Sequence, residues 1–164
     1  MVKRRRSYET GHRPKFLAVV DDSPECAKAV RFAARRCARL GASIVLLGVV
    51  TPPTDEIWLG VGDMVQADAE AEAEELIDVA AAAVRSLAGL EPEKVVRTGI
   101  KADEMVKLIE ADEDISLLVL AAGIGRDGPG PLVSALAGKG AGSFPIPVAI
   151  VPGHLADEEI DALA

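Results

Sequence analysis

Short apolar runs alternate with longer amphipathic stretches along most of this chain. Phe16 to Val20 is a continuous apolar run that ends at two aspartates, which is typical of a strand buried on both faces. The same pattern predicts further strands at residues 43–50, 93–98, 115–121 and 147–151.

Amphipathic segments separate these strands. Ser23 and Pro24 predict the N-cap and first turn of a helix that runs to Leu40 and stops at Gly41,. Helical spacing predicts further helices at residues 63–87, 101–111 and 132–137,. This order predicts one doubly wound, Rossmann-like α/β domain, with a five-stranded parallel sheet and helices on both faces. Ligands bind such sheets at the carboxyl ends of the strands.

Both ends of the chain differ in charge from the predicted domain. The 164 residues suit one domain, for which we take residues 15–152,. The basic run from Lys3 to Arg6 predicts a flexible N-terminal tail over residues 1–14, because ends without anchoring contacts fray. Residues 153–164 form an acidic C-terminal tail.

Charge and composition exclude several partners. The net charge is −8, so the field of the protein repels nucleic-acid phosphates and anionic membranes. Aromatic residues make up only 3% of the chain, which argues against base-stacking surfaces,. No apolar run approaches the ~18 residues that a membrane span needs, and the N-terminus lacks the pattern of a signal peptide. We therefore expect a cytoplasmic protein with no nucleic-acid or membrane partner.

The cysteines and histidines predict packing rather than chemistry. Cys26 and Cys37 lie on one face of the first predicted helix, where buried thiols behave as small apolar groups. His12 and His154 have no cysteine or carboxylate at ligand spacing. The sequence therefore predicts no metal site.

Three motifs in order resemble the universal stress protein family. Residues 19–23 (Val-Val-Asp-Asp-Ser), followed by a helix, resemble the family's opening Ala-Val-Asp-Gly-Ser. Residues 97–99 (Arg-Thr-Gly) resemble its turn after the third strand, and residues 144–151 are similar to its Cys-Pro-Val-Leu-Val-Val ending. The resemblance covers residues 15–152. It implies a non-catalytic stress-response or signalling module that acts as a homodimer, with the fifth strand near the interface.

The resemblance also raises the question of ATP, with Mg²⁺. Members that bind ATP carry Gly-x-x-Gly, nine residues, then Gly-Ser or Gly-Thr after the fourth strand, where backbone N–H groups cradle phosphates. Read without gaps, the four positions hold residues that do not match: Ala121, Ile124, Ser134 and Ala135. A register shifted by four residues offers these candidates: Gly125, Gly128, Gly138 and Lys139. The shift leaves few residues for the helix that normally follows, so the sequence leaves ATP binding open.

Two further positions match the family's adenosine contacts. Asp21 matches the residue that contacts the adenine or ribose, and Val50 falls where the adenine pocket is lined. Asp22 replaces the family's glycine and adds a negative charge close to the phosphate position. Both Asp21 and Val50 also have ordinary structural explanations, as the end of a strand and as core.

A response-regulator receiver is one alternative. Receivers hold Mg²⁺ at paired acids after the first strand, and Asp21-Asp22 has that form. A receiver also needs an Asp that closes the third strand and a Lys that closes the fifth. Those ends read Arg-Thr-Gly at 97–99 and Val-Pro-Gly at 151–153, which argues against this reading.

An ATP-binding sensor or a slow ATPase that uses the loop from Gly125 to Lys139 is another alternative. A third is a hydrolase or transferase that uses the glycine-rich loop, with Ser134 or Ser143 as the candidate nucleophile and Asp21 as its partner. The sequence has no Gly-x-Ser-x-Gly elbow and no histidine in the predicted core,. The sequence favours a non-catalytic protein.

Overall fold

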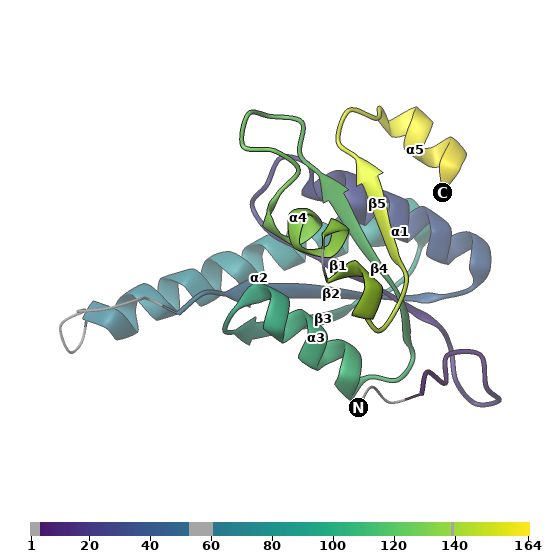
Figure 1. Ribbon diagram of the computed structural model, residues 1–164, viewed down its shortest axis with the longest axis horizontal. Helices are drawn as coiled ribbons and strands as arrows, with labels where there is room; N and C mark the ends of the chain where they lie inside the picture. The colour runs from purple at the N-terminus through teal and green to yellow at the C-terminus, as the bar shows by residue number, and fades with distance from the viewer. Residues whose placement is uncertain (1–3, 53–60, 139) are drawn as a thin grey trace.

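Strands and helices alternate along the chain in the computed structural model, which describes residues 4–52, 61–138 and 140–164, with backbone only for 61–63 (Figure 1). The elements are β1 (Lys15–Val19), α1 (Cys26–Leu40), β2 (Ser43–Val50), α2 (Val61–Ala88), β3 (Glu93–Thr98), α3 (Lys101–Ala111), β4 (Ile115–Ala122), α4 (Pro131–Ala137), a 3₁₀ helix (Ala141–Ser143), β5 (Val148–Pro152) and α5 (Asp157–Leu163). Every predicted strand and helix is present within two residues of its expected limits.

The five strands form one parallel sheet in the order β3-β2-β1-β4-β5. The chain first builds outward from β1 to β3 and then returns to the other side of β1 for β4 and β5. The strand order therefore reverses between β1 and β4, and the doubly wound α/β fold is confirmed. The crevice at such a reversal is where open α/β sheets bind ligands.

Helices cover both faces of the sheet, and the two faces have separate cores. Phe16 and Ala18 of β1 pack in the core that contains residues of α1 and α2. Leu17 and Val19 point to the opposite core, with residues of α3 and α4. Each fully buried aliphatic side chain of this kind contributes about 1.5–3 kcal/mol. Burial on both faces explains why the strands read as continuous apolar runs.

The first helix begins two residues later than Pro24 predicts. Asp21 Oδ1 accepts hydrogen bonds from the Ser23 N–H at 2.9 Å and the Ser23 hydroxyl at 2.5 Å. These bonds hold the chain in a turn, and the first helical residue is Cys26. Gly41 ends α1 as expected, because its φ of 68° lies in the left-handed region,.

Residues 5–12 do not form the flexible tail expected from their charge. The Arg5 guanidinium donates to the carbonyls of Ile109, Asp112 and Ile115, at the corner between α3 and β4. His12 Nδ1 lies 2.7 Å from Asp114 Oδ1 at the same corner. The basic side chain therefore satisfies carbonyl groups at the end of a helix, which charge alone does not reveal.

The acidic C-terminal tail contains a helix that the sequence analysis did not predict. Helix α5 lies beside α1 (Figure 1), and Ile160 is fully buried against the α1 side of the core. The Arg31 guanidinium forms a two-pronged pair with the Asp161 carboxylate, at 2.8 and 2.7 Å. Arg39 donates to the carbonyl of Ala164. The acidic residues of the tail thus meet a row of arginines on α1.

Helix α2 is the longest element and extends beyond the sheet (Figure 1). Within the described part of the chain, no helix is both long and apolar enough to cross a membrane.

Candidate functional site

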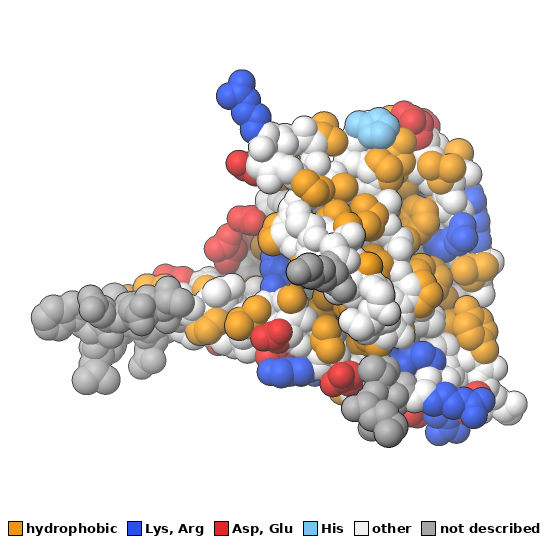
Figure 2. Space-filling model, in the orientation of Figure 1, with side chains coloured by type: hydrophobic (Ala, Val, Ile, Leu, Met, Phe, Trp, Pro, Cys, Tyr) orange, Lys and Arg blue, Asp and Glu red, His pale blue; other side chains and the backbone are white. Residues whose placement is uncertain are grey.

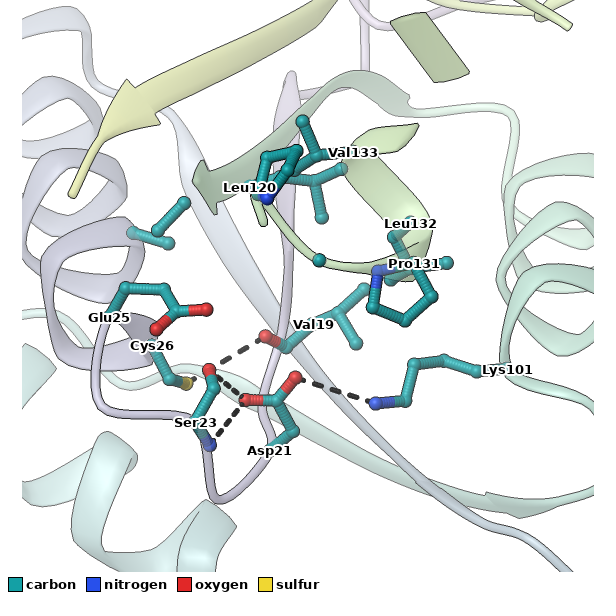
Figure 3. Close-up of a pocket in the computed structure, with 14 residues that line it drawn as sticks. Val19, Asp21, Ser23, Glu25, Cys26, Lys101, Leu120, Pro131, Leu132 and Val133 are labelled. Atoms are coloured by element: carbon teal, nitrogen blue, oxygen red, sulfur yellow. Dashed lines mark hydrogen bonds and ion pairs between the residues drawn. The ribbon is translucent and has the colours of Figure 1, made fainter. Parts of the chain in front are cut away.

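A cleft lies at the carboxyl ends of β1 and β4, where the strand order reverses. Its inner part is a small cavity of about 100 Å³ between Asp21, Lys101 and the start of α4 (Figure 3). Its outer part is a hollow of about 640 Å³ between the start of α1 and residues 123–130, which we call the glycine loop. Glu25 and Pro131 line both parts, so the cavity and the hollow share a wall.

Asp21 is held in one orientation at the floor of the inner cavity. One carboxylate oxygen accepts both bonds from Ser23, and the other lies 3.4 Å from Lys101 Nζ. Figure 3 shows Lys101 reaching this carboxylate from the opposite side of the cavity to Glu25. Asp21 follows β1, and Lys101 is the first residue of α3. The β3-α3-β4 crossover therefore brings together two residues that are far apart in the sequence.

The glycine loop presents backbone donors beside the outer hollow. Gly123 N–H donates to Pro129 O and Gly128 N–H donates to Gly125 O, which closes the loop on itself. Within the described residues, the N–H groups of Gly125, Arg126 and Asp127 have no hydrogen-bond acceptor. Gly125 has open space where a Cβ would lie, and Gly128 has a φ of +79°. Unpaired N–H groups on an open loop can bind an anion.

The two glycine registers fall on different parts of the structure. In the register without gaps, Ala121 lies within β4 and Ser134 lies within α4, where its N–H is bonded to Gly130 O. In the shifted register, Gly125 and Gly128 lie in the loop and α4 occupies the nine-residue interval. The helix expected before β5 is reduced to the 3₁₀ helix Ala141–Ser143, which accounts for the short distance along the chain.

The remaining predicted residues are distributed unevenly. Val50 is buried at 4% exposure and lines a separate hollow of about 210 Å³, together with Asp21 and Lys101. Gly138 follows the last residue of α4, at the opposite end of that helix from the cleft, and lines neither part of it. Lys139 lies outside the described residues. The structure thus brings Asp21, Gly125 and Gly128 to one cleft, with Val50 beside it.

The cleft is rich in negative charge. The Glu25 side chain reaches toward the cavity from the start of α1 (Figure 3). Its Oε1 lies 3.1 Å from the position that a Cβ on Gly123 would take. Burial raises the pKa of the neighbouring Cys26 thiol, and the charges of Asp21 and Glu25 raise that pKa further. Cys26 is therefore a protonated thiol at neutral pH and is no nucleophile.

The described residues do not bring together the groups that a serine nucleophile or a receiver would need. Asp21 is bonded to Ser23 and Lys101, and no hydrogen bond among the described residues joins it to Ser134 or Ser143. The chain also brings no lysine to the end of β5, where a receiver would need one. Among the residues that the structure describes, no group of three or more His, Cys, Asp or Glu side chains is placed to bind a metal ion.

Lys101 and Glu25 are the site residues that sequence reasoning did not single out. A signal for Lys101 was available, since the helix after the third strand begins at the edge of the sheet where Asp21 lies. Glu25 gave no such signal, because its place depends on the path of the glycine loop.

Comparison with known proteins follows the same outline. A model described as the universal stress protein family matches residues 12–152. No match was found among curated proteins. Similar solved structures include the universal stress protein UspA from Lactobacillus plantarum, at a TM-score of 0.72 and 19% identity, over 84% of this chain and 97% of that one.

Several similar solved structures contain nucleotides. The universal stress protein from Archaeoglobus fulgidus, in complex with dAMP, has a TM-score of 0.54 and 19% identity over 92% of this chain and 99% of its own. A family protein from Arabidopsis thaliana with AMP bound has a TM-score of 0.56 and 15% identity, over 88% and 94% of the two chains. At identities this low, the structural similarity shows a shared fold and nothing further.

Proposed function

Because this chain belongs to the universal stress protein family, we propose that it is a non-catalytic stress-response module that binds an adenine nucleotide in the cleft between α1 and the glycine loop. One observation carries the proposal. The N–H groups of residues 125–127, which have no acceptor in the described part of the chain, stand beside a hollow that joins the cavity of the oriented Asp21 carboxylate.

Different parts of the cleft suit the ribose, the adenine and the phosphate of such a ligand. Bonds to Ser23 and Lys101 hold the Asp21 carboxylate in the orientation in which it would accept hydrogen bonds from a ribose. The family resemblance of residues 19–23 implies the same role for Asp21. Val50 offers an apolar surface in the adjoining hollow. The glycine loop offers phosphate donors, and glycine lets the backbone approach a ligand closely. The complexes of similar proteins with AMP and dAMP support the choice of nucleotide class.

Calorimetric titration of the purified protein with AMP and ATP tests the proposal, after mass spectrometry for any nucleotide carried through purification. We expect binding that Asp21→Ala abolishes. Asp78→Ala is the matched control, because it removes a carboxylate that pairs with Lys94 on the surface and does not line the cleft. Absence of binding to the wild-type protein, with no nucleotide carried over, would contradict the proposal.

The proposal excludes turnover. His12 lies at the α3–β4 corner and His154 follows β5, and neither lines the cleft. A histidine, the most frequent general base, is therefore missing from the described walls of the cleft,. Chromatography of ATP after long incubation with the protein should show no ADP above a protein-free blank, and release of ADP would favour the slow ATPase.

We also propose that the module is a homodimer joined near β5. This strand forms one edge of the sheet, and an open edge favours pairing,. Ile150 on β5 is 39% exposed, and apolar side chains gather on the face that carries β5 (Figure 2). Sedimentation should show a dimer that Ile150→Lys dissociates and that Val79→Lys, on the exposed side of α2, leaves intact. A monomeric wild-type protein would refute this proposal. A cytoplasmic location remains a prediction that cell fractionation would test.

A further inference from the structure

The charges that surround the cleft do not match a highly charged ligand. Glu25 and Asp127 line the outer hollow, and Asp21 and Glu25 line the inner cavity. Their cationic neighbours already have acceptors: Lys101 pairs with Asp21, and Lys28 Nζ donates to Leu155 O at 2.5 Å. Arg126 belongs to the glycine loop but does not line the hollow. The described walls thus carry more negative than positive charge.

Of these acids, Glu25 is the one that lines both the inner cavity and the outer hollow. It is the residue before the first turn of α1, with backbone angles of −83° and −10°, and its side chain does not cap that helix. The N–H groups of Cys26 and Lys28 in that turn donate to the carbonyls of Ser23 and Glu25. The Glu25 carboxylate approaches Gly123 at the base of the glycine loop. It is half-buried and accepts no side-chain hydrogen bond within the described residues. Glu25 therefore places a negative charge in the wall that the cavity and the hollow share, beside the base of the glycine loop that offers donors to a phosphate.

We propose that Glu25 is a specificity residue, which makes the cleft select adenine ligands that carry few phosphates and reject ATP. This inference rests on the proposed nucleotide binding and adds the identity of the ligand class. AMP carries about two negative charges and ATP about twice as many. Like charges a few ångströms apart in a partly desolvated cleft repel by amounts that change affinity by about tenfold or more.

The test compares adenosine, AMP and ATP by calorimetric titration in low salt without divalent ions. In the wild-type protein we expect the affinity for ATP to be at least about tenfold weaker than that for AMP. Glu25→Gln keeps the size of the side chain and removes its charge. It should tighten ATP by about tenfold, AMP by a smaller factor, and adenosine by less than about twofold. Glu110→Gln, an exposed acid near the far end of α3 from Lys101, should change none of the three.

A second measurement needs no variant. If a negative wall repels ATP, then added salt screens the repulsion and strengthens ATP binding, while adenosine binding stays constant. A site dominated by cations would show the opposite sign. A purely structural role for Glu25 would lower all three affinities together, without a change in their order.

The outcomes separate the two proposals. Binding of AMP and ATP with equal affinity, or an ATP affinity that Glu25→Gln leaves unchanged, would overturn the role of Glu25 while nucleotide binding stands. Failure of all three ligands to bind either protein would overturn the proposed function itself. A weakening of ATP binding with added salt in the wild-type protein would also overturn the charge selection, even if the variant did not fold.

Discussion

Ile160→Ala probes whether helix α5 is an integral part of the fold. The Ile160 side chain is fully buried in the core beneath α1. Substitution to alanine removes three carbons and leaves a cavity, and such changes cost about 2–5 kcal/mol. The pair between Arg31 and Asp161 is partly exposed, so solvent screens it and it adds little to the docking of the helix.

Because α5 is a seven-residue terminal helix, the damage can take two forms. If α5 stays docked, the free energy of unfolding, measured in urea by circular dichroism, falls by about 2–4 kcal/mol. If α5 detaches, the global loss is limited to the free energy of docking, and the α5 amides lose their protection against hydrogen exchange. Leu163→Ala is the control, since Leu163 is 60% exposed and its loss should cost less than about 0.5 kcal/mol. Equal effects of the two substitutions, with no change in exchange, would refute the packing described for Ile160.

Three further predictions concern other parts of the fold. Burial raises the pKa of the Cys37 thiol to about 12 from its ordinary 9.0, so the unfolded chain loses this proton at a lower pH than the folded chain. The free energy of unfolding should therefore fall by about 1.4 kcal/mol per pH unit as pH rises between those values. Urea unfolding of Cys37→Ala should show a shallower decline with pH, and parallel curves for the two proteins would contradict the burial of this thiol. Gly99→Ala should lower the free energy of unfolding by about 1–3 kcal/mol, because φ is +155° and a Cβ would lie 2.7 Å from Glu104 Oε1. Thermal unfolding measures this loss. Gly125→Ala is the control, because a Cβ on Gly125 would lie in open space. Arg5→Ala should expose residues 4–12 to limited proteolysis, because the carbonyls that it caps at the α3–β4 corner lose their donor; an unchanged cleavage pattern would show that Arg5 does not anchor this segment.

The strands and the doubly wound order could be read from the sequence because their physics is local. A strand buried on both faces needs a continuous apolar run, and 16–20 and 115–121 are such runs,. Asp21 could be placed at the ligand edge for the same reason, since it closes a strand. The position of Asp21 in the cleft therefore agrees with simple topology.

The ends of the chain required knowledge that no local pattern contains. Helix α5 buries only Ile160, so its sequence shows no apolar face, and its acids find their partners only in Arg31 and Arg35 of α1. The sequence of Arg5 and its neighbours is typical of a solvated basic run. The carbonyls at the end of α3 that accept its hydrogen bonds are more than a hundred residues away along the chain. In both cases a tertiary partner overrides the local expectation.

The glycine motif shows a third kind of limit. Counting residues from β4 offered two registers for the motif, because the spacing depends on whether a helix lies inside the nine-residue interval or after it. The structure puts α4 inside it, which moves Gly125 and Gly128 to the loop. Gly138, which shares their register, stays outside the cleft.

The strand order has a consequence for the order in which the protein is made. Phe16 of β1 pairs with Ile44 of β2 soon after both are synthesised, but its other partner, Leu117 of β4, emerges far later along the chain. A growing chain on the ribosome therefore holds a half-sheet with β1 as an unpaired apolar edge until β4 arrives. Such an edge is a template for association with other nascent chains. We expect chaperone dependence to be concentrated in this interval of synthesis, before the second half of the sheet covers β1.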